Sequence, residues 1–303
     1  MEGVPPKLNL SSLKGGWKGG SEMETPSLES IEQPTFDFSN LDCYASVTHP
    51  GLRTFQEDMV AVKNFADTYN FIEKAYMVID GHGGSDSALF LKNHFLDHVE
   101  MKLKDITSTE MARLAVMECF KEIELKWAEN RKDTSGACVL LCLQLSQLNE
   151  SGTKSFLIAS CGDCRTQIVR KDATFDFLTV EHDPNIPEER ERINKAGLYV
   201  SKGRVIGELA VSRSIGDFEY KGELENQEDH AVTCVPEIIL YDFHPEDSRL
   251  VLMTDGFYEQ MESKVLAQFC SDESNDSKQM VQNMFQRAID LRTNDNLTAI
   301  IIS

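Results

Sequence analysis

The sequence predicts an α+β fold in which antiparallel sheets are covered by helices. Short apolar runs bounded by glycine or turn residues, which are typical of buried strands, follow one another along much of the chain. Segments with apolar residues at helical spacing are inserted between groups of these runs. A strict alternation of single strands and helices would indicate a parallel sheet, so the observed order favours antiparallel sheets.

Each expected helix or strand is predicted from the spacing of its apolar residues and from the residues that flank it. Thr107 and Glu110 form a capping-box pattern before the second helix, and Pro187 and Gly197 stand at the start and just past the end of the third. Residues 1–34 are rich in Gly, Pro, Ser, Lys and Glu and show no period, so we expect a flexible tail before one domain over 35–303. The expected strands are 44–47, 59–62, 76–79, 139–145, 156–159, 250–253 and 297–302, and the expected helices are 86–106, 109–130, 187–196 and 277–291.

Composition and net charge argue against several classes of protein. The formal net charge of −20 argues against nucleic acid or an anionic membrane surface as the main partner. No stretch approaches the roughly 18 apolar residues of a membrane span, and the N-terminal residues lack the apolar segment of a signal peptide. The eight cysteines are scattered, as expected for buried thiols in a reducing compartment. We expect a cytoplasmic protein, with the nucleus as an alternative additional location, and we expect it to be a monomer.

Four aspartates stand at the ends of apolar runs. Asp80 and Asp255 follow such runs, Asp163 follows one through Cys161-Gly162, and Asp295 precedes the last. Carboxylates brought together at the rim of a sheet cannot all ionise unless a cation joins them. A hard divalent cation, Mg²⁺ or Mn²⁺, prefers such oxygen ligands.

Six motifs occur in a fixed order over most of the chain, and together they resemble the type 2C family of metal-dependent protein serine/threonine phosphatases. The resemblance runs from about Asp42 to Ser303. The motifs are Arg53-x-x-x-Glu57-Asp58, Asp80-Gly81-His82-Gly83-Gly84, Cys161-Gly162-Asp163-Cys164-Arg165, the segment 209–217 ending in Ser214-Ile215-Gly216-Asp217, Thr254-Asp255-Gly256, and Asn294-Asp295-Asn296-Leu297-Thr298.

This resemblance implies a fold, an activity and a ligand set. The fold is a sandwich of two central antiparallel β-sheets, flanked by helices on both outer faces, with the metals at one end between the sheets. The activity is hydrolysis of phosphoserine and phosphothreonine on phosphorylated protein substrates, by a water activated by two Mg²⁺ or Mn²⁺ ions. The implied metal ligands are Asp80, the Gly81 carbonyl, Asp255 and Asp295.

The residue types fit these roles. Asp80 is the candidate to bridge two metals because a carboxylate has two oxygens. Glu57 and Asp58 are expected to hold metal-bound waters or to ligate the second ion. Arg53 offers parallel N–H donors to a phosphate. His82 is the candidate general acid for the poor alkoxide leaving group.

Two cysteine-based sites are weaker interpretations of the same region. Cys164 and Arg170 have the Cys-x5-Arg spacing of a phosphate loop, but the residues between them have strand character and no glycine. Cys161 and Cys164 have Cys-x-x-Cys spacing without a second cysteine pair nearby, so a zinc or redox site is not expected.

Some positions depart from the family pattern. Asp163 and Glu259 occupy the positions of a third, weaker metal site, but the family has aspartate where this chain has Glu259. Ser135-Gly136-Ala137-Cys138 lacks the usual Ser/Thr-Thr pair, which we interpret as a packing change, and Ala196 replaces a common glycine.

Three functions remain open at this point. The first is the active phosphatase, favoured because the expected ligands are all present. The second is a catalytically weak or inactive regulator of the same fold that binds phosphoprotein partners, and the third is a phosphohydrolase of small phosphate esters. The segment 212–235, acidic at Glu223, Glu225, Glu228 and Asp229, is either a solvated loop or a flap that selects substrates with basic or neutral flanks.

Overall fold

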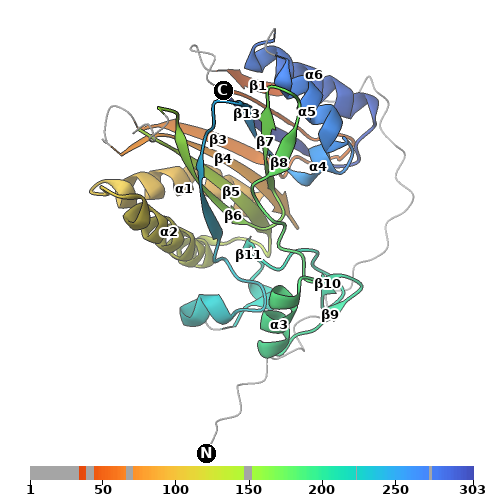
Figure 1. Cartoon of the computed structure of the whole chain (residues 1–303). Helices are drawn as coiled ribbons and strands as arrows, with labels where there is room; N and C mark the ends of the chain where they lie inside the picture. Colours follow the sequence, from red (N-terminus) through yellow and green to blue (C-terminus); the bar gives the residue numbers. More distant parts are fainter. Residues whose placement is uncertain (1–33, 39–43, 66–70, 147–151, 223, 273–274) are drawn as a thin grey trace, which may run out of the picture.

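The computed structural model of the chain describes residues 34–38, 44–65, 71–146, 152–222, 224–272 and 275–303 (Figure 1). The expected N-terminal tail, residues 1–34, lies outside these ranges except for Pro34. No helix within the described ranges is long and apolar enough to cross a membrane. The seven cysteines that the structure describes are all buried and free, as predicted.

The first of the two sheets contains both the N-terminal and the C-terminal strands. Its order is β1-β2-β14-β13-β7-β8, and each neighbouring pair is antiparallel. Its strands are β1 (Thr35–Phe38), β2 (Tyr44–His49), β7 (Arg165–Arg170), β8 (Phe175–Phe177), β13 (Asp247–Met253) and β14 (Leu297–Ile302).

The second sheet has the order β12-β6-β5-β4-β3, with β11 added against the start of β5, and is also antiparallel. Its strands are β3 (Met59–Asn64), β4 (Ile72–His82), β5 (Gly136–Leu145), β6 (Ser155–Cys161), β11 (Ile215–Gly216) and β12 (Glu237–Asp242).

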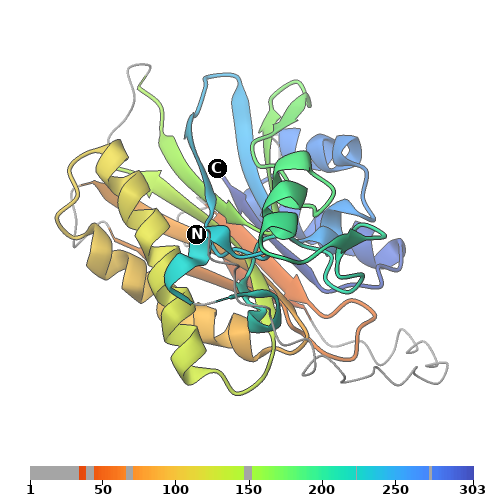
Figure 2. The same cartoon turned by 90° about the horizontal axis from the view of Figure 1, so that it is seen from below.

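Helices cover the outer faces of both sheets, as Figure 2 shows from below. One apolar cluster joins α1 (Asp86–Leu103) and α2 (Thr109–Asn130) to the second sheet. Another joins α4 (Asp255–Tyr258), α5 (Ser263–Ser271) and α6 (Ser277–Asp290) to the first. The predicted α+β sandwich with helices on both outer faces is therefore confirmed.

The core between the sheets explains why the last strand, β14, is almost entirely apolar. In β14, Ala299 and Ile301 pack toward the helices, whereas Ile300 and Ile302 belong to the cluster between the sheets. Because successive side chains of a strand point to opposite faces, a strand buried on both faces needs apolar residues at every position. All six residues of β14 are buried accordingly.

A smaller lobe follows β8. It contains α3 (Pro187–Lys195), the short ribbon β9 (Val200–Ser201) and β10 (Arg204–Val205), and the 3-10 helices η3 (Phe218–Tyr220) and η4 (Leu224–Asp229). Ile193, Leu198, Val205 and Val232 form its own buried cluster. The described residues of the segment 212–235 belong to this lobe, and β11 near the start of the segment pairs with β5 of the second sheet (Figure 1).

Most predicted elements are confirmed, with three corrections. The helix cap before α2 is Ser108, whose hydroxyl accepts a hydrogen bond from the Met111 amide at 3.3 Å, so the capping box at Thr107 was wrong. β4 extends through His82, so Asp80 stands within the strand and not after it, because its backbone continues to pair with β5. Helix α5 was not predicted, since its nine residues form too short a segment to establish a helical period.

The packing between the sheets predicts a graded loss of stability. Ile300 is fully buried there, so Ile300→Ala should lower the free energy of unfolding by about 2–5 kcal/mol and Ile300→Val by about 0.5–1.5 kcal/mol. Leu240→Ala on the edge strand β12, where Leu240 is 49% exposed, is the control and should change little. Urea denaturation measures all three, and equal effects of the two alanine variants would contradict a packed core between the sheets.

Candidate active site

The predicted acidic residues converge at one end of the sandwich because of the antiparallel register. Met59 pairs with Ile79 and His49 pairs with Leu297, so the start of β3 lies beside the end of β4, and the end of β2 lies beside the start of β14. Met253 likewise pairs with Ala299. Asp255 begins α4 just after β13, and Asp80 and His82 lie at the end of β4. The loops at this end carry the other predicted site residues, which are Arg53, Glu57, Asp58, Asp163 and Asp295.

Burial and the charges of neighbouring carboxylates raise the pKa values of the carboxyl groups at this site. Burial is the largest cause that raises the pKa of Asp80 well above its usual range, followed by the charges of Asp58, Asp255, Asp163 and Asp295. Burial and neighbouring carboxylates also raise the pKa of Asp255 to about 8. Carboxyl groups whose pKa values are raised in this way bind protons at neutral pH unless a cation takes the place of the protons.

Asp58 is the most deeply buried of the group, with 2% of its surface exposed. Its Oδ2 accepts a hydrogen bond from the Thr254 hydroxyl at 2.8 Å. Burial raises its pKa to about 7, although the bonds from Thr254 and Thr298 oppose the shift. Asp58 is therefore tied to the segment that carries Asp255, which places it behind the more accessible carboxylates.

Two glycines allow the backbone segments of the site to approach one another. A Cβ on Gly81 would lie 2.4 Å from the Glu57 carbonyl oxygen, and one on Gly256 would lie 1.9 Å from the Asn296 carbonyl oxygen. Both distances are too short for a real side chain. Any other residue would separate β4 from the loop carrying Glu57, or Asp255 from Asp295.

Asn296 organises the loop before β3, and its role was not predicted. Its Nδ2 donates to the carbonyls of Pro50 at 3.0 Å and Phe55 at 2.9 Å, and its Oδ1 accepts from the Glu57 amide at 2.8 Å. Glu57 in turn accepts from the Gly84 amide at 2.7 Å. Asn296 stands within a quoted motif, but its partners lie about 240 residues away, so spacing could not reveal them.

Asp163 lies at the turn between β6 and β7 and meets Asp80 and Cys164. One potential ligand atom from each of these three residues lies within 4.8 Å of the other two. The Asp163 Oδ1 atom is buried and has no hydrogen-bond partner within the described part of the chain. An unsatisfied carboxylate oxygen beside a second carboxylate suits a divalent cation.

Cys164 was not predicted to take part in this group. The strand β7 from Arg165 to Arg170 confirms that Cys164 does not begin a phosphate loop. The Cys164 thiol is nevertheless buried next to the carboxylates, and burial raises its pKa well above its usual range. Glu259, the other expected third-site residue, is exposed and raises the pKa of Asp255 by its charge. The third metal site stays a prediction.

Arg53 lies at the site as expected, with 53% of its side chain exposed. Its terminal nitrogen forms an ion pair with Asp295 Oδ2 at 2.7 Å, and its Nε donates to the Asn294 carbonyl at 2.6 Å. The guanidinium is thus held beside a predicted metal ligand while part of it faces solvent, as a residue that binds an incoming phosphate requires.

His82 also lies at this end, and its Nε2 atom is 2.7 Å from Asp217 Oδ2. Burial lowers the pKa of His82, but the charge and hydrogen bond of Asp217 oppose this effect and raise it overall. A histidine with a raised pKa retains its proton near neutral pH, as general acid catalysis requires.

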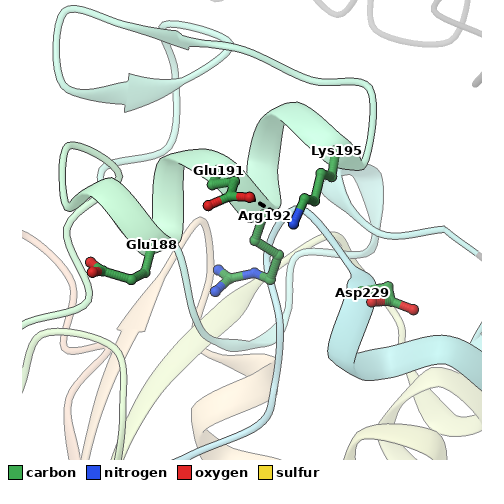
Figure 3. Close-up of a pocket in the computed structure, with 5 residues that line it drawn as sticks. All are labelled: Glu188, Glu191, Arg192, Lys195 and Asp229. Carbon is green, nitrogen blue, oxygen red and sulfur yellow. Dashed lines mark ion pairs between the residues drawn. The ribbon is translucent and has the colours of Figure 1, made fainter.

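A hollow, shown in Figure 3, lies on the smaller lobe and not at the carboxylates. It is lined by Glu188, Glu191, Arg192, Lys195 and Asp229. Lys195 pairs with Glu191 at 2.7 Å, and Arg192 donates to the carbonyls of Ser212, His230 and Ala231. These contacts fasten the segment 212–235 to α3, so the hollow is better explained as a structural joint than as a binding site.

The comparisons with known proteins agree with this geometry. The family model for "Protein phosphatase 2C" matches residues 46–297, which include every predicted site residue. The chain belongs to the protein phosphatase 2C family. The resemblance stated from the motifs is therefore confirmed, and the expected enzyme class, a metal-dependent protein phosphatase, is the class of this family.

Individual relatives cover much of the chain. A probable protein phosphatase 2C of Paramecium tetraurelia is 32% identical over 196 residues, which span 61% of this chain and 63% of that protein. A probable protein phosphatase 2C of Oryza sativa subsp. japonica is 29% identical over 86% of this chain and 82% of its own length.

Solved structures share the fold at lower identity. A crystal structure of a phosphatase from a pathogenic strain of Toxoplasma gondii has a TM-score of 0.73 and 20% identity, over 86% of this chain and 92% of that one. The structure of a Caenorhabditis elegans sex-determining protein has a TM-score of 0.70 and 20% identity, over 86% and 64% of the respective chains. Both support the sandwich fold of this protein phosphatase 2C member.

The raised carboxyl pKa values predict that metal binding depends on pH. Asp58 and Asp255, with pKa values of about 7 and 8, carry protons at pH 6 that a cation must displace. The affinity for Mn²⁺ should therefore rise from pH 6 to pH 8, by about tenfold per pH unit for each displaced proton. Calorimetry in two buffers of different ionisation enthalpy measures both the affinity and the released protons.

Asp255→Asn is the matched variant for this measurement, since it keeps the shape of the side chain but has no proton to release. We expect it to bind Mn²⁺ more weakly and with a shallower dependence on pH. Equal Mn²⁺ affinity of the unmodified protein at pH 6 and pH 8 would contradict the assignment of these carboxylates as ligands.

Proposed function

We propose that this chain hydrolyses phosphoserine and phosphothreonine on proteins, with two Mg²⁺ or Mn²⁺ ions in the active site. The observation that carries this proposal is the group of carboxylates whose pKa values burial and mutual repulsion raise together. Such a group is costly for the fold without a cation. Membership of the protein phosphatase 2C family supports the same reaction.

The residues that would hold the ions follow from their positions. Asp80, the Gly81 carbonyl, Asp255 and Asp295 form the proposed ligand set, and Glu57 and Asp58 lie next to it. The oxygen donors and the unsatisfied Asp163 Oδ1 fit hard divalent cations. When bound, two such ions supply a water that is acidic enough to act as nucleophile near neutral pH.

The remaining roles belong to side chains of the protein itself. Arg53 would bind and orient the phosphate through its exposed guanidinium. His82 would donate a proton to the serine or threonine oxygen as the bond to phosphorus breaks, because an alkoxide is a poor leaving group. The expected monomeric state and the cytoplasmic or nuclear location stay predictions.

Turnover of a phosphothreonine peptide tests the function directly. We expect hydrolysis with Mn²⁺ or Mg²⁺, loss of activity in EDTA, and loss of activity in Asp255→Asn even with excess metal. Asp172→Asn, which changes an exposed carboxylate in the turn between β7 and β8, is the control and should retain full activity.

The other outcomes separate the rival functions. A folded, Mn²⁺-binding protein without turnover on any phosphate ester would contradict the enzyme and favour the regulator that binds phosphoprotein partners. Turnover of small phosphate esters without turnover of any phosphopeptide would instead favour the small-ester phosphohydrolase.

A further inference from the structure

The contact between His82 and Asp217 joins the candidate site to the smaller lobe. The two side chains come from elements 135 residues apart and meet at 2.7 Å between His82 Nε2 and Asp217 Oδ2. The His82 side chain is 29% exposed, whereas the Asp217 side chain is 6% exposed. A carboxylate buried behind a partly exposed imidazole is the arrangement that fixes the ring in one orientation.

Asp217 is held by a backbone conformation that few residues adopt. Its φ of +52° and ψ of +40° lie in the left-handed region, which is unfavourable for residues other than glycine, with asparagine and aspartate the most tolerant. The Ser214 hydroxyl donates to the same Asp217 Oδ2 at 2.5 Å. Strain of this kind persists only where the surrounding structure enforces it, and it is concentrated at functional sites.

Gly136 provides the space for this carboxylate. A Cβ at position 136 would lie 2.1 Å from Asp217 Oδ2, so any side chain there would displace Asp217 from His82. Gly136 begins β5 opposite Gly216 of β11, so the space at this position decides how closely the turn carrying Asp217 approaches the second sheet.

A buried ion pair fixes the chain on both sides of Asp217. Lys221 Nζ donates to Glu124 Oε1 of α2 at 2.5 Å and to the Ser214 carbonyl at 2.8 Å. Glu124 Oε2 accepts from the Gly216 amide at 2.8 Å. Both charged side chains are fully buried, and such pairs are seldom a source of net stability. Their effect here is to hold the turn from Ser214 to Lys221 against α2.

We propose that Asp217 is a positioning residue for catalysis, which orients the His82 imidazole toward the leaving oxygen of the substrate. This inference rests on the proposed function. With Nε2 engaged by Asp217, the Nδ1 atom of His82 is the one that transfers the proton to the leaving oxygen. Glu124, Lys221 and Ser214 act through Asp217, so α2 and the smaller lobe jointly set the geometry of the general acid.

The dependence on the leaving group distinguishes this role from general support of the fold. Serine and threonine oxygens need protonation as they leave, whereas p-nitrophenolate is a weak base that leaves without it. We expect Asp217→Asn to lower kcat on a phosphothreonine peptide by about 10- to 100-fold and kcat on p-nitrophenyl phosphate by about threefold or less. Asparagine keeps the size of the side chain and tolerates the left-handed backbone.

Further variants keep the test decisive. Ser214→Ala should give the same pattern with a smaller loss, even if Asp217→Asn folds poorly. His82→Gln should show the full leaving-group pattern, and adding Asp217→Asn to it should cost little more, because the two residues act as a unit. The affinity of Asp217→Asn for Mn²⁺, measured by calorimetry, should be unchanged, and Asp242→Asn on the edge strand β12 is the control.

Each contrary result has a distinct meaning. If the unmodified protein does not hydrolyse the phosphopeptide, the proposed function itself fails. If His82→Gln shows the leaving-group pattern but Asp217→Asn lowers both activities equally, or lowers neither, the positioning role is contradicted while the function stands. Full additivity of His82→Gln and Asp217→Asn would also contradict it.

Discussion

Repulsion among buried carboxylates is the constraint on which the active end of this protein depends. Burial raises the pKa of Asp58, Asp80, Asp163 and Asp255, and the charges of neighbouring carboxylates raise the pKa values of Asp58, Asp80 and Asp255 further. Such a group opposes folding unless protons or cations neutralise it. The two-sheet scaffold must therefore be stable enough to hold the group together, and its central strands β5, β6 and β14, which are buried on both faces, contribute to that stability.

The antiparallel register brings the predicted site residues together at one end of this scaffold. Because neighbouring strands run in opposite directions, alternate turns of both sheets meet at one end, and the predicted ligands stand in or beside these turns. Gly81 and Gly256 then let the backbone segments approach more closely than any side chain would permit. Asn296 connects the loop before β3 to the start of β14, so the position of Glu57 depends on both sheets.

Sequence patterns predicted the parts of the site that depend on local chemistry. Asp80, Asp255 and Asp295 were predicted as site residues because each stands beside an apolar run within a recognisable motif. Helix α2 was predicted because its apolar residues recur at helical spacing over a long segment. The contacts of Asp217, Asn296 and Glu124 could not be predicted, since their partners are about 90 to 240 residues away. The capping box at Thr107 failed for a different reason, because neighbouring Ser108 offers the same hydroxyl one position later.

The two lobes thus contribute different halves of one site, with the sandwich supplying the carboxylates and the smaller lobe supporting the histidine. The central claim is that the carboxylates around Asp80 form a binuclear metal centre. Anomalous diffraction from a crystal grown with Mn²⁺ tests it most directly. The account predicts two manganese peaks that both contact the Asp80 carboxylate, one of them also contacting Asp255 and Asp295. A single peak, or peaks that avoid Asp80, would contradict it.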